Sequence, residues 1–71
     1  MDAKLNGFLQ SIKNEYVWFK QHKETNAKKI EEYTEKGSLS MAFYYTGARD
    51  SSDIAANALK SLLLEYGIEV E

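Results

Sequence analysis

The chain has 71 residues, of which 44% are hydrophobic and 28% charged, and its formal net charge is −2. This composition excludes a disordered chain, and the length predicts one small domain, residues 1–71, because so short a chain cannot divide its core. The absence of cysteine excludes disulfides and thiolate metal sites and favours a reducing, cytoplasmic location. We expect neither a signal peptide nor a membrane span, because no apolar stretch is long enough for either.

Charge is distributed unevenly along the chain. Residues 1–29 carry a net charge of +3, and residues 30–71 carry −5. Such a division occurs in proteins that bind nucleic acid or a charged partner, but solvated helices with mixed charges produce it as well. We interpret it as a solvated surface.

The first predicted element is a long amphipathic helix at about residues 3–36. Its apolar residues recur every three or four positions, which is the spacing of one helical stripe. The stripe lapses near residues 24–26, where a turn and a second helix are the alternative. Gly37 then predicts the helix end. The stripe consists of Leu5, Leu9, Ile12, Tyr16, Phe19, Ile30 and Tyr33.

Residues 39–46 alternate between apolar and smaller or more polar side chains, which is typical of a strand. A third short helix capped by Ser38 is the alternative, since the segment is too brief to decide. The tail at 68–70 also alternates and could form a short strand paired with it.

A turn is predicted at residues 47–53, followed by a second principal helix at about 51–66. Asp50, Ser51 and Ser52 are favourable residues for a helix N-terminus, and Gly67 is placed to end the helix with Ile68 packing back on it. Its predicted apolar face consists of Ile54, Ala55, Ala58, Leu59, Leu62, Leu63 and Tyr66. The fold class is thus mainly α, with α+β as the alternative.

The sequence contains few of the residues that catalytic and metal sites require. His22 is the one histidine, there is no cysteine, and the four glycines are scattered. A nucleophile with its base and a zinc site each need more histidine or cysteine side chains than this, and a phosphate loop needs glycines close together. The carboxylates of Glu31, Glu32 and Glu35 suggest solvated ion pairs with lysines more than a cation site. We expect a protein that is not an enzyme and that has no cofactor and no metal.

One local pattern suggests an anion site. Arg49, Ser51 and Ser52 precede the second predicted helix, where a guanidinium, two hydroxyls and free backbone amides could meet. The simpler interpretation is that Asp50 or Ser51 caps the helix while Arg49 pairs with a nearby acid.

Nucleic-acid binding is the alternative function, through lysines of the first helix. Aromatic residues lie among these lysines, but the sequence pI near 5.4 is far below that of typical DNA-binding domains. The lysines concerned are Lys20, Lys23, Lys28 and Lys29.

Apolar residues that fall off the helical stripes suggest a different function. Val17 and Trp18 lie on opposite sides of the first stripe, and Leu64 points away from the apolar face of the second helix. Exposed aromatic and leucine side chains mark partner surfaces. We therefore expect a small protein-binding module that acts stoichiometrically as an inhibitor, adaptor or regulatory subunit, alone or as a homodimer. No motif in the chain identifies a family.

Overall fold

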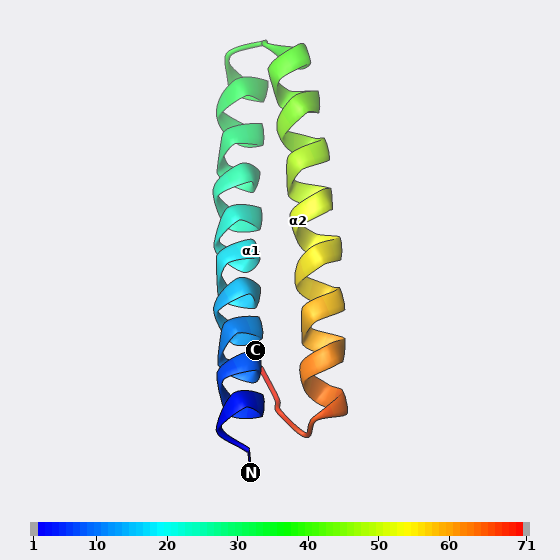
Figure 1. Cartoon of the computed structure of the whole chain (residues 1–71). Helices are drawn as coiled ribbons and strands as arrows, with labels where there is room; N and C mark the ends of the chain where they lie inside the picture. The colour runs from blue at the N-terminus through cyan, green and yellow to red at the C-terminus, as the bar shows by residue number, and fades with distance from the viewer. Residues whose placement is uncertain (1, 71) are drawn as a thin grey trace.

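The computed structural model describes residues 2–70, which form two long helices, α1 (Ala3–Glu35) and α2 (Leu39–Glu65). The helices lie antiparallel and are joined by a short turn at one end, as Figure 1 shows. The Cα atoms extend over 53 Å along the hairpin and 16 Å across it. The mainly α fold with two principal helices is therefore confirmed. Within the described residues, neither helix has the length and apolar character needed to cross a membrane.

α1 is one continuous helix, so the alternative turn near residues 24–26 does not form. It begins where an Asp2 side-chain oxygen accepts a hydrogen bond of 3.0 Å from the Lys4 amide. It ends at Glu35, and Gly37, just beyond the C-cap residue Lys36, has a φ of 76°, which is costly for any residue with a side chain. The Ser38 amide donates to the Tyr33 carbonyl, which completes the expected C-terminal cap.

The predicted boundary within the second half of the chain is wrong. Residues 39–46 are neither a strand nor a separate third helix, because they form the first two turns of α2. Residues 47–53 are helical as well, so α2 begins twelve residues before the predicted start at 51. The helical alternative for 39–46 is right in type, although the Ser38 side chain makes no capping hydrogen bond.

Contacts with α1 explain why α2 continues through a segment rich in capping residues. Ser52 is buried against α1, and Asp53 forms an ion pair with Lys23 across the hairpin. Asp50 accepts from the Arg49 side chain instead of capping a helix. These side chains are therefore already engaged in the helical state, and tertiary packing overrides the local preference for a turn.

The buried side of α2 also differs from the predicted apolar face. Ala42, Ser52, Ala56 and Leu63 are buried, whereas Ile54, expected in that face, is 71% exposed. The small side chains of Ala42, Ser52 and Ala56 let α2 lie close to α1 from the turn to the middle of the hairpin. Part of the predicted apolar face consequently stays on the surface.

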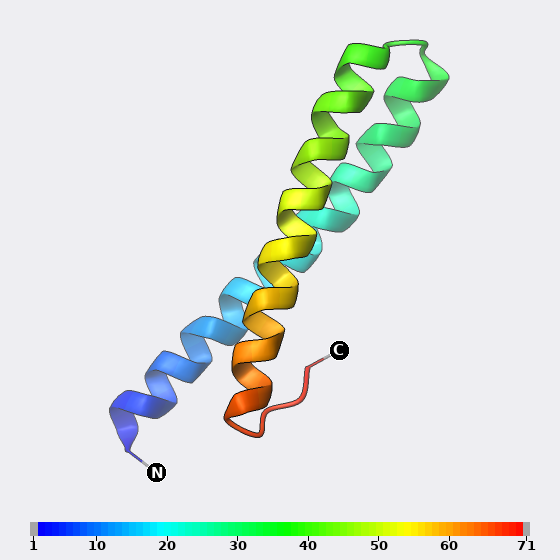
Figure 2. The same ribbon diagram turned by 90° about the vertical axis from the view of Figure 1, so that its right-hand side faces the viewer.

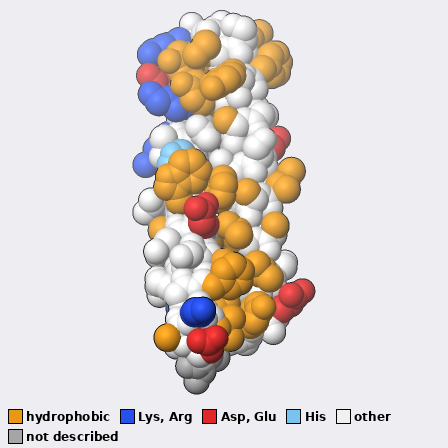
Figure 3. Space-filling view, in the orientation of Figure 1, with side chains coloured by type: hydrophobic (Ala, Val, Ile, Leu, Met, Phe, Trp, Pro, Cys, Tyr) orange, Lys and Arg blue, Asp and Glu red, His pale blue; other side chains and the backbone are white. Residues whose placement is uncertain are grey.

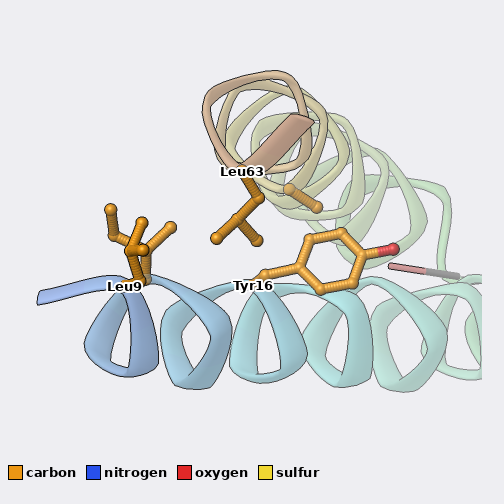
Figure 4. Close-up of a cluster of buried hydrophobic side chains, with 5 residues drawn as sticks. Leu9, Tyr16 and Leu63 are labelled. Carbon is orange, nitrogen blue, oxygen red and sulfur yellow. The ribbon is translucent and has the colours of Figure 1, made fainter. Parts of the chain in front are cut away.

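The core lies towards the end of the hairpin opposite the turn. Leu63 is fully buried and points from α2 between Leu9 and Tyr16 of α1, as Figure 4 shows. Ile12 and Ala56 complete this cluster. With one fully buried large side chain, the core is small even for a domain of this size.

The tail after α2 packs on the core without forming a strand. Gly67 has a φ of 74°, and the Ile68 amide donates to the Leu63 carbonyl over 3.0 Å, which confirms the predicted helix end. Residues 68–70 then return towards α1 on one side of the hairpin (Figure 2), where Ile68 and Val70 pack against the core. The predicted strand at 68–70 is absent, since its expected partner is helical.

Candidate interaction surface

The side of the hairpin away from the tail carries a band of apolar side chains over both helices. Figure 3 shows this band along most of the molecule, with acidic and basic side chains between its apolar groups. On α1, Phe8, Trp18 and Tyr33 fall within a sector of about 80°. On α2, Tyr44 and Leu62 are separated by five helical turns and so lie on the same side. We call this surface the front face; its residues are Phe8, Trp18, Tyr33, Met41, Tyr44 and Leu62.

Trp18 forms the centre of the front face on α1. Its ring stacks on His22, with centroids 3.6 Å apart, and packs edge-on against Phe19 at 4.9 Å. The Nδ1 atom of His22 lies 2.8 Å from the Trp18 carbonyl oxygen, so it carries the proton and donates. Half of the Trp18 side chain nevertheless remains exposed. The indole is thus held in one orientation with its outer part open to solvent.

Two tyrosines of the front face, Tyr33 and Tyr44, lie beside the interhelical turn and both contact Tyr45. Tyr33 of α1 stacks on Tyr45 of α2, with centroids 5.5 Å apart and ring planes 7° from parallel. Tyr44 packs edge-on against Tyr45 at 5.0 Å. These contacts join the apolar sectors of α1 and α2 into one surface, and Tyr44 is still 66% exposed.

A charged group borders the tyrosines. The Lys36 ammonium lies 5.4 Å from the centre of the Tyr33 ring and donates to Glu32 at 2.9 Å. The hydrogen bond from Lys36 and the nearby charge of Lys29 lower the pKa of Glu32, and the Glu32 partner raises the pKa of Lys36. The Lys36–Glu32 and Lys29–Glu32 ion pairs are exposed, so they add little to the stability of the fold. Their main effect is to place charged groups at the edge of the front face.

The three residues predicted to bind a partner do not lie on one surface. All three are about half exposed: Val17 at 49%, Trp18 at 50% and Leu64 at 48%. Trp18 lies on the front face. Val17 lies on the side of the tail, where it lines a groove with Val70, and Leu64 points to that same side from α2. Trp18 is therefore the member that belongs to the apolar band.

A groove lies beside the tail. It has a volume of about 540 Å³ and is open along its length. Most of its residues are of polar type, but the surface that they present to the groove is mainly apolar. The residues that line it are Gln10, Lys13, Asn14, Tyr16, Val17, Lys20, Gln21, Glu24 and Val70.

The structural basis of the predicted anion site is wrong. Arg49, Ser51 and Ser52 lie inside α2, so their amides belong to the helical hydrogen-bond ladder instead of being free at an N-terminus. Arg49 pairs with Asp50 at 3.2 Å, as the simpler interpretation held, although no helix begins there.

The lysines proposed for nucleic-acid binding point in different directions. Lys20, Lys23, Lys28 and Lys29 are distributed around the whole circumference of α1. Lys23 is paired with Asp53 and Lys29 lies 3.5 Å from Glu32. They do not form one basic stripe of the kind that follows a phosphate backbone.

Glu31, Glu32 and Glu35 lie in the last two turns of α1. The Glu32 carboxylate is held by lysines, and over residues 2–70 no three potential metal-ligating side chains come together.

Sequence reasoning overlooked Phe8, Tyr33, Met41, Tyr44 and Leu62 as surface candidates. The five-turn spacing of Tyr44 and Leu62 was visible, but the turn predicted between them concealed it. Comparison with known proteins adds no further candidate, since no family model, no curated protein and no solved structure matches this chain.

Proposed function

We propose that this protein is a small non-catalytic protein-binding module that acts stoichiometrically, as an inhibitor, adaptor or regulatory subunit. The observation that supports the proposal most strongly is the front face, an apolar band with Trp18 and Tyr44 at least half exposed. Exposed aromatic and aliphatic side chains that gather on one side of a monomeric protein mark binding sites.

The composition of the front face favours a protein as the ligand. Tryptophan, tyrosine, phenylalanine and methionine are the residues enriched at protein interfaces, and tryptophan and tyrosine contribute most to binding energy. The rings of Trp18 and Tyr33 are already held by stacking on His22 and Tyr45. Because these side chains are ordered before binding, less conformational entropy is lost on association.

Two further features support a non-catalytic, intracellular role. The one histidine of the chain is stacked on Trp18, and the chain has no cysteine that could serve as its nucleophile. The lack of cysteine supports the cytoplasm as the compartment in which the protein acts.

Site-specific photo-crosslinking tests the proposal. A photoreactive phenylalanine derivative replaces Tyr44 on the front face in one variant and its neighbour Phe43 in another. Phe43 is 73% exposed but lies about 100° further round α2, off the front face. After irradiation in the native cell lysate, we expect a protein adduct from position 44 and little from position 43. Equal yields, or no adduct from either position of the folded variants, would contradict the proposal.

A further inference from the structure

We propose that the front face is covered by the front face of a second copy of this chain, with the two hairpins antiparallel in a four-helix bundle. This inference rests on the proposed function, because it identifies the partner of the same surface. It commits to self-association, and a different protein on the front face is an outcome that the experiments below would reveal.

The surface area of the isolated chain supports a partner of this size. The hairpin exposes 5156 Å², whereas a compact folded chain of 8.1 kDa exposes about 4500 Å². The excess of roughly 650 Å² approaches the approximately 800 Å² per partner that a stable interface buries. Two hairpins that pair through this face would thus bring each chain close to the exposure of an ordinary folded protein.

The shape of the front face fits a helical partner of the same length. Between Tyr44 and Leu62, the front of α2 presents the small side chains of Ala48, Ala55 and Ala58. Small residues allow another helix to approach closely, and four-helix bundles bury such faces between pairs of helices. A second hairpin offers two helices of matching length, so it can cover the band from end to end.

Charge favours one relative direction of the two hairpins. The end that contains the turn, residues 19–57, has no net charge, while the open end, residues 1–18 and 58–71, has −2. A parallel dimer would place the two −2 ends side by side. An antiparallel dimer places each neutral turn end against the partner's open end, which avoids that repulsion.

Sedimentation of the purified protein tests self-association directly. We expect the wild type to sediment as a dimer at high micromolar concentration and to dissociate on dilution. Tyr44→Lys should shift the equilibrium towards monomer at least tenfold, because it places a charge within the interface. Phe43→Lys, the control next to it in sequence, should sediment as the wild type does.

Wild-type protein that stays monomeric from micromolar to millimolar concentration would overturn the inference without any variant. So would a Phe43→Lys variant that dissociates as readily as Tyr44→Lys. Circular dichroism at each concentration covers the case in which the monomer unfolds: helicity of the wild type should then fall on dilution, and that of Tyr44→Lys should be low throughout.

A spin label tests the orientation. The chain has no cysteine, so Glu35→Cys gives one label per chain, at an exposed site beside the turn. In the antiparallel dimer the two labels should be separated by a distance comparable to the 53 Å length of the hairpin. A separation no greater than twice its 16 Å width would overturn the antiparallel arrangement.

The two proposals can fail separately. A monomeric wild type whose position 44 crosslinks to a different protein would refute the dimer and support the binding module. A monomeric wild type that forms no front-face adduct would refute both.

Discussion

The Lys23 ammonium lies 2.6 Å from the Asp53 carboxylate, and this ion pair joins α1 to α2 across thirty residues of sequence. Both side chains remain more than 40% exposed. The pairs Lys29–Glu32, Lys36–Glu32 and Arg49–Asp50 each lie within a single helix. The Lys23–Asp53 pair therefore shows which levels of the two helices lie side by side.

A double-mutant cycle on this pair should give a small coupling energy. We expect a coupling energy between Lys23→Met and Asp53→Asn of about 0.2–1 kcal/mol, because water screens exposed charges. Urea denaturation of the two single variants and the double variant measures it. A coupling energy above about 2 kcal/mol would show that the pair is far less solvated than its exposure indicates.

Replacement of Leu63 should damage the fold far more than replacement of its neighbour. Leu63→Ala removes the fully buried side chain between Leu9 and Tyr16, and we expect a loss of about 2–5 kcal/mol. That loss is comparable to the whole stability of so small a core. Leu64→Ala, half exposed on the same helix, serves as the control in thermal and urea denaturation, and similar losses for both would contradict the assigned core.

The positive φ of Gly37 predicts a cost that comes from the backbone alone. A Cβ added there would meet no atom within 4 Å, so no clash adds to the strain. We expect Gly37→Ala to reduce the free energy of unfolding by about 1 kcal/mol, measured by urea denaturation. Gly7→Ala is the control, since it lies inside α1 in equally open space and should stabilise the helix.

The long first helix could be predicted because its pattern is local. Leu9, Ile12 and Tyr16 repeat at helical spacing and all three are buried. Both helix ends at Gly37 and Gly67 could be predicted as well, since each depends on a positive φ that glycine adopts at little cost. These features need no knowledge of the rest of the chain.

The start of α2 and the extent of the front face could not be predicted in this way. Local preference places Asp53 near a helix start, whereas in the structure it lies inside α2 and pairs with Lys23, thirty residues earlier. Which side of α2 meets α1 depends on how the two helices pack against each other. A helical wheel describes one helix alone, so it does not give this side. Leu62 was therefore placed in a core face, although it lies partly on the surface.

Acid should weaken the ion pairs next to the turn. The pKa of Glu32 is lowered by its hydrogen bond to Lys36 and by Lys29, so their stabilising effect is present above the ordinary pKa of glutamate. It is lost as the pH falls through the lowered pKa of the folded protein. An NMR titration of the side-chain carboxyl should give Glu32 a midpoint below that of an unperturbed glutamate. Lys36→Met should raise this midpoint, whereas Lys4→Met, at the far end of α1, should leave it unchanged.

Trp18→Ala should weaken association without unfolding the chain. Half of the indole is exposed, and the core cluster of Leu9, Ile12, Tyr16 and Leu63 does not include it. We therefore expect the helical circular-dichroism signal to persist and the loss of stability of the monomer to stay well below the 3–5 kcal/mol of a buried tryptophan. Association should weaken strongly, because an aromatic anchor is removed from the centre of the front face.

Val17→Ala is the control for this variant. Val17 is as exposed as Trp18 but lies on the side of the tail, so its truncation should leave association unchanged. Light scattering and thermal melts of the three proteins provide the comparison. If Trp18→Ala no longer folds while the wild type is monomeric, the indole belongs to the core and the front face loses its central residue. If Val17→Ala weakens association as much as Trp18→Ala, the groove beside the tail, and not the front face, is where the partner binds.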